Sequence, residues 1–512
     1  MKRAALASLI LLLLLRLKQC HCVVRAEADL APGPQPRGGV SVHQRHGLNL
    51  SRGSFPKGFI FGTATSAYQV EGMAGKDGRG PSIWDVFIRK PGVIADNGTA
   101  DVSVDEYHRY KEDVNLMHNL NFDAYRFSIS WSRIFPQGRG KVNWKGVAYY
   151  NRLIDYLIKK GEISQFDSLI DLFNNLTNCV GLSRKDYAHF AEFCFKTFGD
   201  RVKNWMTFNE PRVVAALGYD NGVFAPGRCS KPYGNCTQGN SGTEPYIVTH
   251  HLILCHAEAV KRYRQKYQTS RPPKEQGTSM WDGNNVNHDL CQTPEESFIH
   301  PIIYGEYPKS MQQIVKERLP KFTEEEVKIV KGSIDYVGIN QYTTYYMYDN
   351  HQQTGEVPGY QNDWHAVERN GVPIGPRAYS KWLCIVPWGM YKAVTYIKEH
   401  YGNPTIFISE SAVWVSTATA GMDDPGNVSI PVGRHDTRRI RFYSRYLRQL
   451  KRAMDDGANV IGFFAWSLLD NFEWLSGYTS RFGIVYVDYH SLKRYPKMSA
   501  YWFKKMLRRN KH

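Results

Sequence analysis

Two glutamates each stand at the end of a short run that is typical of a buried β-strand. Glu210 ends the run Met206–Glu210 and Glu410 ends the run Ile406–Glu410, both rich in apolar, β-branched or aromatic residues. Pro211 would stop strand pairing just after the first carboxylate. Parallel barrels keep their reactive groups at the carboxyl ends of strands, and a pair of carboxylates is the minimum equipment for hydrolysing a glycosidic bond.

Either glutamate alone would more often be a helix start or a loop residue, so the accompanying motifs decide the interpretation. The segment Phe59–Gly72 ends a strand-like run in glutamine, glutamate and glycine. The segment Phe463–Trp474 places two tryptophans and two acids after another apolar run. Carboxylates, amides and indoles from distant strands suit a ligand that is dense in hydroxyl groups and has a flat C–H face. These segments predict a sugar site.

Five motifs give the chain a resemblance to plant β-glucosidases of glycoside hydrolase family one, over about residues 55–507. They are Phe59–Gly72, Tyr125–Trp131, Thr207–Pro211, Gly338–Tyr342 and Trp466–Trp474. The resemblance implies an α/β fold, the TIM (β/α)8 barrel, as a single domain with long βα loops. It also implies a retaining β-glycosidase that hydrolyses terminal non-reducing β-D-glucosyl residues by double displacement, without a cofactor. The substrate would be a small-molecule β-glycoside or an oligosaccharide.

The resemblance also assigns roles to residues. Glu410 would be the nucleophile and Glu210 the proton donor and acid/base, with carboxylates about 5 Å apart. Their surroundings would have to differ, because the two roles need different pKa values. The family residues that match the remaining positions bind substrate or, for Arg126 and Tyr342, hydrogen-bond the nucleophile: Gln69, Arg126, Asn209, Tyr342, Trp382, Trp466, Glu473 and Trp474. For Arg126 a structural ion pair, and for Trp382 an ordinary half-buried tryptophan, are the alternatives.

Strand-like runs alternate with helical patterns along the chain, which predicts parallel pairing and a barrel rather than a sandwich. The predicted strands are Gly58–Thr63, Ala124–Ser130, Val202–Phe208, Tyr336–Asn340, Thr405–Ser409 and Val460–Trp466. The predicted helices are Val104–Leu120, Tyr149–Lys160, Tyr187–Thr197, Thr243–Tyr267, Glu324–Lys331, Met390–Tyr401 and Arg438–Asp456.

The sequence departs from the family pattern at three places. Glu162–Asn175 lacks the family's third-strand histidine, although Ser168–Phe173 is compatible with a strand. Gln276–Asn285 is polar and rich in glycine and asparagine where the fifth strand is expected, and Ser409–Ala412 replaces Thr-Glu-Asn-Gly. A lost sugar hydrogen bond and an open barrel edge predict weak glycone binding and low thermal stability. They leave an alternative open: a catalytically impaired or inactive secreted sugar-binding homologue, or an inaccurate gene model.

The N-terminus predicts secretion. Lys2 and Arg3 precede the leucine-rich run Ala4–Leu15, which fits a signal peptide and is short for a membrane span. We expect a signal peptide over residues 1–28, a Pro/Gly-containing segment over 29–54, the barrel over 55–507 and a basic tail over 508–512. The mature protein would be extracellular, in the apoplast or the vacuole, and free of the membrane.

Cysteines and sequons fit that compartment. The resembling enzymes imply a disulfide between Cys229 and Cys236. No cysteine or histidine has metal-ligand spacing, so no metal is expected. Sequons for N-glycosylation stand at Asn49, Asn97, Asn175, Asn235 and Asn427.

The formal net charge of +17 raises the question of a polyanionic partner. We discount nucleic acid, because a secreted protein meets none and the basic residues look spread along the chain apart from the tail Lys504–Arg509. Attraction to acidic cell-wall polysaccharide is the better use of this charge.

Overall fold

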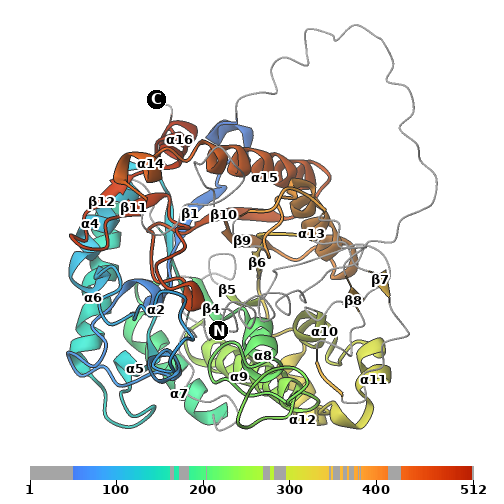
Figure 1. Cartoon of the computed structure of the whole chain (residues 1–512). Coiled ribbons are helices and arrows are strands. Elements are labelled where there is room, and N and C mark those ends of the chain that lie inside the picture. The colour runs from blue at the N-terminus through green and yellow to red at the C-terminus, as the bar shows by residue number, and fades with distance from the viewer. Residues whose placement is uncertain are drawn as a thin grey trace, which may run out of the picture.

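A parallel sheet forms the centre of the molecule (Figure 1). The computed structural model describes residues 50–161, 167–171, 184–202, 204–268, 277–281, 296–344, 348–349, 358–360, 366–367, 374–378, 380, 382–412 and 428–509. The strands of the main sheet are β1 (Ile60–Ala64), β2 (Ala124–Ser128), β3 (Asp167–Asp171), β4 (Asn204–Asn209), β5 (Gly277–Trp281), β6 (Val337–Asn340), β9 (Ile406–Ser411) and β10 (Val460–Trp466).

These eight strands are hydrogen-bonded in the order β5-β4-β3-β2-β1-β10-β9-β6, and every pair is parallel. The two end strands, β5 and β6, approach each other within 8 Å between Cα atoms, so the sheet curls round on itself. The TIM barrel predicted from the sequence is confirmed. Two small antiparallel pairs accompany it, β7 (Tyr348–Asp349) with β8 (Ala366–Val367) and β11 (Val485–Val487) with β12 (Arg494–Pro496).

Helices surround the sheet (Figure 1). They are α2 (Ala67–Val70), α3 (Ile83–Phe87), α4 (Glu106–Asn119), α5 (Trp131–Ile134), α6 (Trp144–Gly161), α7 (Arg184–Phe198), α8 (Pro211–Tyr219), α9 (Glu244–Lys266), α10 (Glu296–Tyr304), α11 (Lys309–Val315), α12 (Glu324–Val330), α13 (Pro387–His400), α14 (Ile430–Arg434), α15 (Thr437–Asp455) and α16 (Met498–Met506). Short 3-10 turns are η2 (Arg52–Ser54), η3 (Lys316–Arg318) and η4 (Trp474–Ser476). The predicted helices differ from these by a few residues at their ends. Among the described residues, no helix combines the length and apolar character needed to cross a membrane.

The structure agrees with the sequence analysis at the third barrel strand and corrects it at the fifth. A strand is present at β3, close to the predicted Ser168–Phe173. The expectation of a missing fifth strand is wrong, because β5 forms within the polar run and pairs with β4. That pairing has one register irregularity, as does the pairing of β9 with β6, and the pairing of β9 with β10 has two. The rest of the departing segments, 172–175 and 282–285, lies outside the described residues.

A layer of large side chains fills the barrel interior. Met206, Phe407 and Phe464 come from three strands and pack with Ala124 and Tyr336. Glycines on the strands make room for this layer. A Cβ on Gly62 would lie 2.2 Å from the ring of Phe464, and one on Gly338 would lie 2.3 Å from Cε of Met206. The barrel is therefore packed below its mouth, which confines any ligand to one end.

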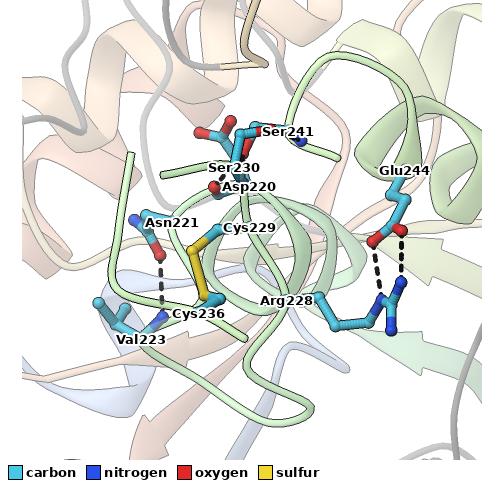
Figure 2. The surroundings of a disulfide bond; sticks show 9 residues. All are labelled: Asp220, Asn221, Val223, Arg228, Cys229, Ser230, Cys236, Ser241 and Glu244. Atoms are coloured by element: carbon cyan, nitrogen blue, oxygen red, sulfur yellow. Dashed lines mark hydrogen bonds and ion pairs between the residues drawn. A yellow bond between two sulfur atoms is a disulfide. The ribbon is translucent and has the colours of Figure 1, made fainter. Parts of the chain in front are cut away.

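A disulfide between Cys229 and Cys236 closes the loop after α8, as the resemblance implies (Figure 2). Nε and Nη2 of Arg228 donate to the carboxylate of Glu244 at 2.8 and 2.6 Å, which ties this loop to the start of α9. Two sequon asparagines, Asn97 and Asn235, are exposed. The other three, Asn49, Asn175 and Asn427, lie outside the described residues.

Candidate active site

The strand register brings the predicted site residues to one end of the barrel. Asn340 on β6 is paired with Glu410 on β9. Ala64 on β1 is paired with both Arg126 on β2 and Trp466 on β10. Since the strands are parallel, these positions all lie near the carboxyl ends, where a parallel barrel keeps its chemistry.

Glu410 is buried between two hydrogen-bond donors. Nη1 of Arg126 donates to its Oε1 and the Tyr342 hydroxyl donates to its Oε2. Arg126 and Glu410 are only 2% and 3% exposed, so their ion pair is nearly free of solvent screening. Burial, with the Glu410 charge, raises the pKa of the Tyr342 hydroxyl well above its usual value, so this group remains a donor.

A chain of hydrogen bonds continues from Arg126 to the second carboxylate. Nη2 of Arg126 donates to Oδ1 of Asn209 at 2.7 Å. Nδ2 of Asn340 donates to the same oxygen at 2.9 Å and to Oε1 of Glu210 at 3.1 Å. The hydroxyl of Ser409 donates to Oδ1 of Asn340 at 2.8 Å, which fixes the orientation of that amide. The two glutamates therefore belong to one polar network.

Glu210 is held in an uncommon backbone conformation. Its φ is 49° and its ψ is 53°, and Pro211 begins α8 immediately after it. A left-handed conformation costs a residue with a Cβ about 1–2 kcal/mol. Strained residues cluster at functional sites, where the surrounding structure holds them in place. Here the strain turns the chain sharply from β4 into α8 at the carboxylate.

A buried histidine supports β4 just before this turn. Nε2 of His256 lies 2.6 Å from the carbonyl oxygen of Ser333, so that nitrogen carries the proton. Burial lowers the pKa of His256 to about 4, so its Nδ1 is unprotonated. This nitrogen accepts a hydrogen bond from the hydroxyl of Thr207, with Oγ1 and Nδ1 2.8 Å apart. Thr207 precedes Asn209 and Glu210 on β4, and the histidine anchored on α9 thus fixes the end of the strand.

Gln69 and Glu473 meet near Glu410 at the same end of the barrel. Nε2 of Gln69 donates to Oδ1 of Asn471 at 3.1 Å, to the carbonyl of Phe472 at 3.0 Å and toward Oε2 of Glu473 at 3.3 Å. Burial, with repulsion from Glu410, raises the pKa of Glu473 to about 8. At neutral pH this carboxyl is therefore mostly protonated and can both donate and accept a hydrogen bond.

Three tryptophans add apolar surface. Trp474 stacks on Tyr68 with ring centroids 6.0 Å apart and contacts Trp84 at 4.6 Å. Trp466 is 6% exposed and ends β10, whereas Trp382 is 46% exposed. The ring of Trp382 lies edge-on to that of Tyr342, with ring centroids 6.3 Å apart, so Trp382 adjoins a hydrogen-bond donor of Glu410. An exposed position beside the site fits the aglycone entrance implied by the resemblance.

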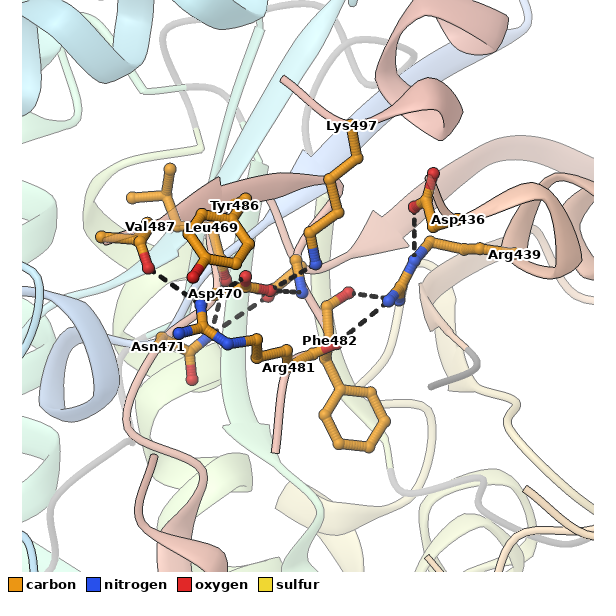
Figure 3. Close-up of polar contacts among 12 residues, drawn as sticks. Asp436, Arg439, Leu469, Asp470, Asn471, Arg481, Phe482, Tyr486, Val487 and Lys497 are labelled. Carbon is orange, nitrogen blue, oxygen red and sulfur yellow. Dashed lines mark hydrogen bonds and ion pairs between the residues drawn. The ribbon is translucent and has the colours of Figure 1, made fainter. Parts of the chain in front are cut away.

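Asp470 anchors the loop that carries Glu473 and Trp474 (Figure 3). Nζ of Lys497 donates to its Oδ1 at 2.7 Å, and Nη1 of Arg481 donates to its Oδ2 at 3.0 Å. Burial lowers the pKa of Lys497 to about 8. Removing one partner of a buried ion pair costs about 3–5 kcal/mol. Asp470 is therefore a structural acid, and the sequence pattern alone did not separate it from Glu473.

The site contains two residues that the sequence analysis did not assign, Asn340 and Ser409. Both lie inside quoted segments, and both are polar residues at the end of an apolar strand. That position was the available signal. Their roles depend on the pairing of β6 with β9, which the sequence alone does not reveal. Among the described residues, no three His, Cys, Asp or Glu side chains are grouped so that they could hold a metal ion.

Comparisons with known proteins agree on one family. The model of glycosyl hydrolase family 1 matches residues 51–512. Beta-glucosidase 44 of Arabidopsis thaliana is 64% identical over 489 residues, which cover 91% of this chain and 93% of the relative. Beta-glucosidase 1 of Oryza sativa subsp. japonica is 62% identical over 508 residues, covering 94% and 96%. A crystal structure of a rice β-glucosidase superimposes with a TM-score of 0.82 at 44% identity, covering 90% of this chain and 100% of that one.

The first prediction concerns Asn340. Asn340→Ala removes the donor to Glu210 and should lower kcat/KM on substrates with poor leaving groups by about 10- to 150-fold, because a hydrogen bond to a charged group contributes about 1.5–3 kcal/mol. Activated aryl glucosides should be affected less. Asn143→Ala is the matched control, since Nδ2 of Asn143 also makes two hydrogen bonds of 2.9 Å, to backbone carbonyls away from the site. An equal loss on both kinds of substrate would contradict the role.

The second prediction concerns the pH dependence of stability at Glu473. Its pKa in the folded protein is raised, so the folded state binds this proton more tightly and loses relative stability as pH rises from about 4.5 to about 8. Glu473→Gln cannot titrate. The melting temperature of this variant, minus that of the unaltered protein, should therefore increase by roughly 2 °C between pH 5 and pH 8. Thermal melts at both pH values test this, and a constant difference would contradict it.

Proposed function

The chain belongs to glycosyl hydrolase family 1, and we propose that Glu410 and Glu210 are the two carboxylates through which it works. It is a β-glucosidase, which hydrolyses small β-glucosides with retention of configuration. The observation that carries the assignment is the hydrogen-bond chain that joins the two glutamates through Arg126, Asn209 and Asn340. No finding favours the inactive alternative.

Glu410 is the proposed nucleophile. Its two oxygens are oriented by donors from different strands, and these donors interact with the charged form of the carboxylate that must attack the anomeric carbon. As the glycosyl-enzyme bond forms, Arg126 and Tyr342 keep the carboxylate aligned. A mutant of the rice β-glucosidase has been captured in a covalent complex with Glc, which supports a covalent step for the present chain as well.

Glu210 is the proposed acid/base. It donates a proton to the departing glycosidic oxygen and then takes one from the incoming water. Asn340 donates to one of its oxygens, so the proton to be transferred sits on the other oxygen. The strained turn at Glu210 and the support of β4 by His256 hold this carboxylate at the end of β4.

Recognition of the glycone falls to the polar groups around the mouth. Asn209 accepts two hydrogen bonds through Oδ1, which leaves its Nδ2 as the donor available to a sugar. Gln69 and the protonated Glu473 offer further donors and acceptors, and the indoles of Trp466 and Trp474 provide flat apolar surface. A buried polar group that meets no hydroxyl costs roughly 1–3 kcal/mol, so these groups discriminate between sugars.

The third prediction separates the roles of the glutamates. Glu410→Gly should abolish hydrolysis and regain activity with azide, because azide can attack the anomeric carbon in place of the missing carboxylate. Glu210→Gln should slow the hydrolysis of substrates with poor leaving groups by about 10²- to 10⁴-fold, because these leaving groups need protonation. Substrates with good leaving groups should be spared. Steady-state kinetics on a series of aryl β-glucosides measure both effects. Equal losses across the series for Glu210→Gln would refute the assignment of this residue.

Secretion with glycosylation is a further part of the proposal, supported by the basic, leucine-rich N-terminus and by the exposure of Asn97 and Asn235. The fourth prediction is that the mature chain begins near residue 29 and carries glycan at these two asparagines. Intact-mass analysis of the protein from its own tissue should show both changes. Asn97→Gln and Asn235→Gln should each remove one glycan mass. A chain that begins at Met1 and carries no sugar would overturn this part.

A further inference from the structure

Helix α15 carries a dense row of basic residues. Between residues 438 and 452 it contains six arginines and one lysine and no acid. Five of these arginines recur at intervals of three or four residues, which places them along one face of a helix: Arg438, Arg441, Arg445, Arg448 and Arg452. With a rise of 1.5 Å per residue, the row is about 21 Å long. The basic residues are therefore not simply spread along the chain, as the sequence analysis held.

The row faces outward. Arg438, Arg441, Arg445 and Arg452 are exposed, whereas Tyr443, Tyr446 and Leu450 on the other face of α15 are buried. Arg438, Arg441 and Arg445 form no ion pair or hydrogen bond with any residue that the structure describes. Asp436, just before the helix, is buried and paired with Arg439. Asp455 and Asp456 stand at the other end of the helix, where they contact Lys451 and Tyr391.

A neighbouring helix carries further basic residues. Helix α16 packs against α15 (Figure 1), with the rings of Tyr443 and Phe503 4.8 Å apart. Its end contributes the exposed basic residues Lys504, Lys505 and Arg508, and no acidic residue occurs from 489 to the end of the chain. Like charges at helical spacing destabilise a helix, so this surface costs stability unless an anion covers it.

We propose that this surface, Arg438, Arg441 and Arg445 of α15 with the end of α16, binds an acidic polysaccharide of the polyuronate type. A polyuronate is an extended chain with regularly repeated carboxylates, which matches a straight row of guanidinium groups. Arginine pairs with carboxylates through two parallel hydrogen bonds and is more weakly hydrated than lysine. The chain acts on carbohydrate, so a carbohydrate polyanion is the partner that charge and substrate class favour together.

The basic surface is separate from the mouth of the barrel, but the opposite face of the same helix, α15, contacts residues of the site. On the buried face of α15, the hydroxyl of Tyr443 donates to the carbonyl of Trp466, and that of Tyr446 donates to the carbonyl of Tyr342. The arginines occupy the opposite face. A polysaccharide held there would tether the enzyme and leave the mouth open, so binding and hydrolysis can be tested independently.

The test compares two variants that each lose three positive charges from the full-length mature enzyme. One is Arg438→Gln/Arg441→Gln/Arg445→Gln. The matched control is Arg89→Gln/Lys141→Gln/Lys321→Gln, whose residues are exposed and lie between helices elsewhere in the chain. Binding to polygalacturonate is measured at about 0.15 M ionic strength, where exposed charges beyond about 8 Å are screened. Methyl-esterified pectin, duplex DNA and vesicles of anionic lipid are measured beside it.

We expect the α15 variant to bind polygalacturonate about tenfold more weakly than the unaltered enzyme and the control to stay within about twofold. Binding should weaken with salt and be much weaker for the esterified polymer. Equal binding by the two variants, or no binding by the unaltered enzyme, would refute the proposed role of the α15 arginines in binding. Stronger binding to DNA or to vesicles would refute the partner class. Both variants should hydrolyse an aryl β-glucoside as fast as the unaltered enzyme does. If the unaltered enzyme shows no hydrolysis, the proposed function is contradicted and the proposed surface is not.

Discussion

The active end of the barrel depends on one buried cation, Arg126. Its guanidinium group reaches Glu410 with one nitrogen and Asn209 with another, and so connects β2, β9 and β4. Losing one partner of a buried ion pair costs about 3–5 kcal/mol, because a charge is left without compensation. Sequence reasoning weighed a structural ion pair against a role beside the nucleophile. The geometry unites them, since the same contacts that neutralise the buried charge also orient the carboxylate.

Carboxylates at this end are given different environments by the groups around them. Glu410 faces a cation and a phenol, Glu210 faces the amide of Asn340, and Glu473 faces Gln69 and the charge of Glu410. Neutral Glu473 is the consequence, because burial beside a like charge favours the protonated form. One barrel mouth thus holds the proposed nucleophile, the proposed proton donor and a third acid without three mutually repelling anions.

Sequence patterns found the barrel because its strands are mostly apolar runs with clear ends, and the prediction for β10 matches to the residue. They failed at β5, where Gly277–Trp281 has little strand character of its own. Pairing with β4 supplies what the local sequence lacks, since strand preference depends on neighbours more than on intrinsic propensity. Asn340 was missed for a related reason: its partner Glu210 is distant in sequence, and only the register brings them together.

The sequence analysis predicted helix α15 but missed its basic face, because charge was read by blocks rather than by helical period. The arginines of α15 look scattered in the linear sequence, yet their spacing places them on one face. The other face of the helix is apolar and aromatic because it packs against α13, α16 and β10, so the arginines had no alternative to the surface. Tyr443 and Tyr446 then connect that covering face to the backbone of Trp466 and Tyr342. A single amphipathic pattern thus serves two purposes in this helix. Its buried face supports the sugar site, and its exposed face carries the positive charge that we propose attracts anions.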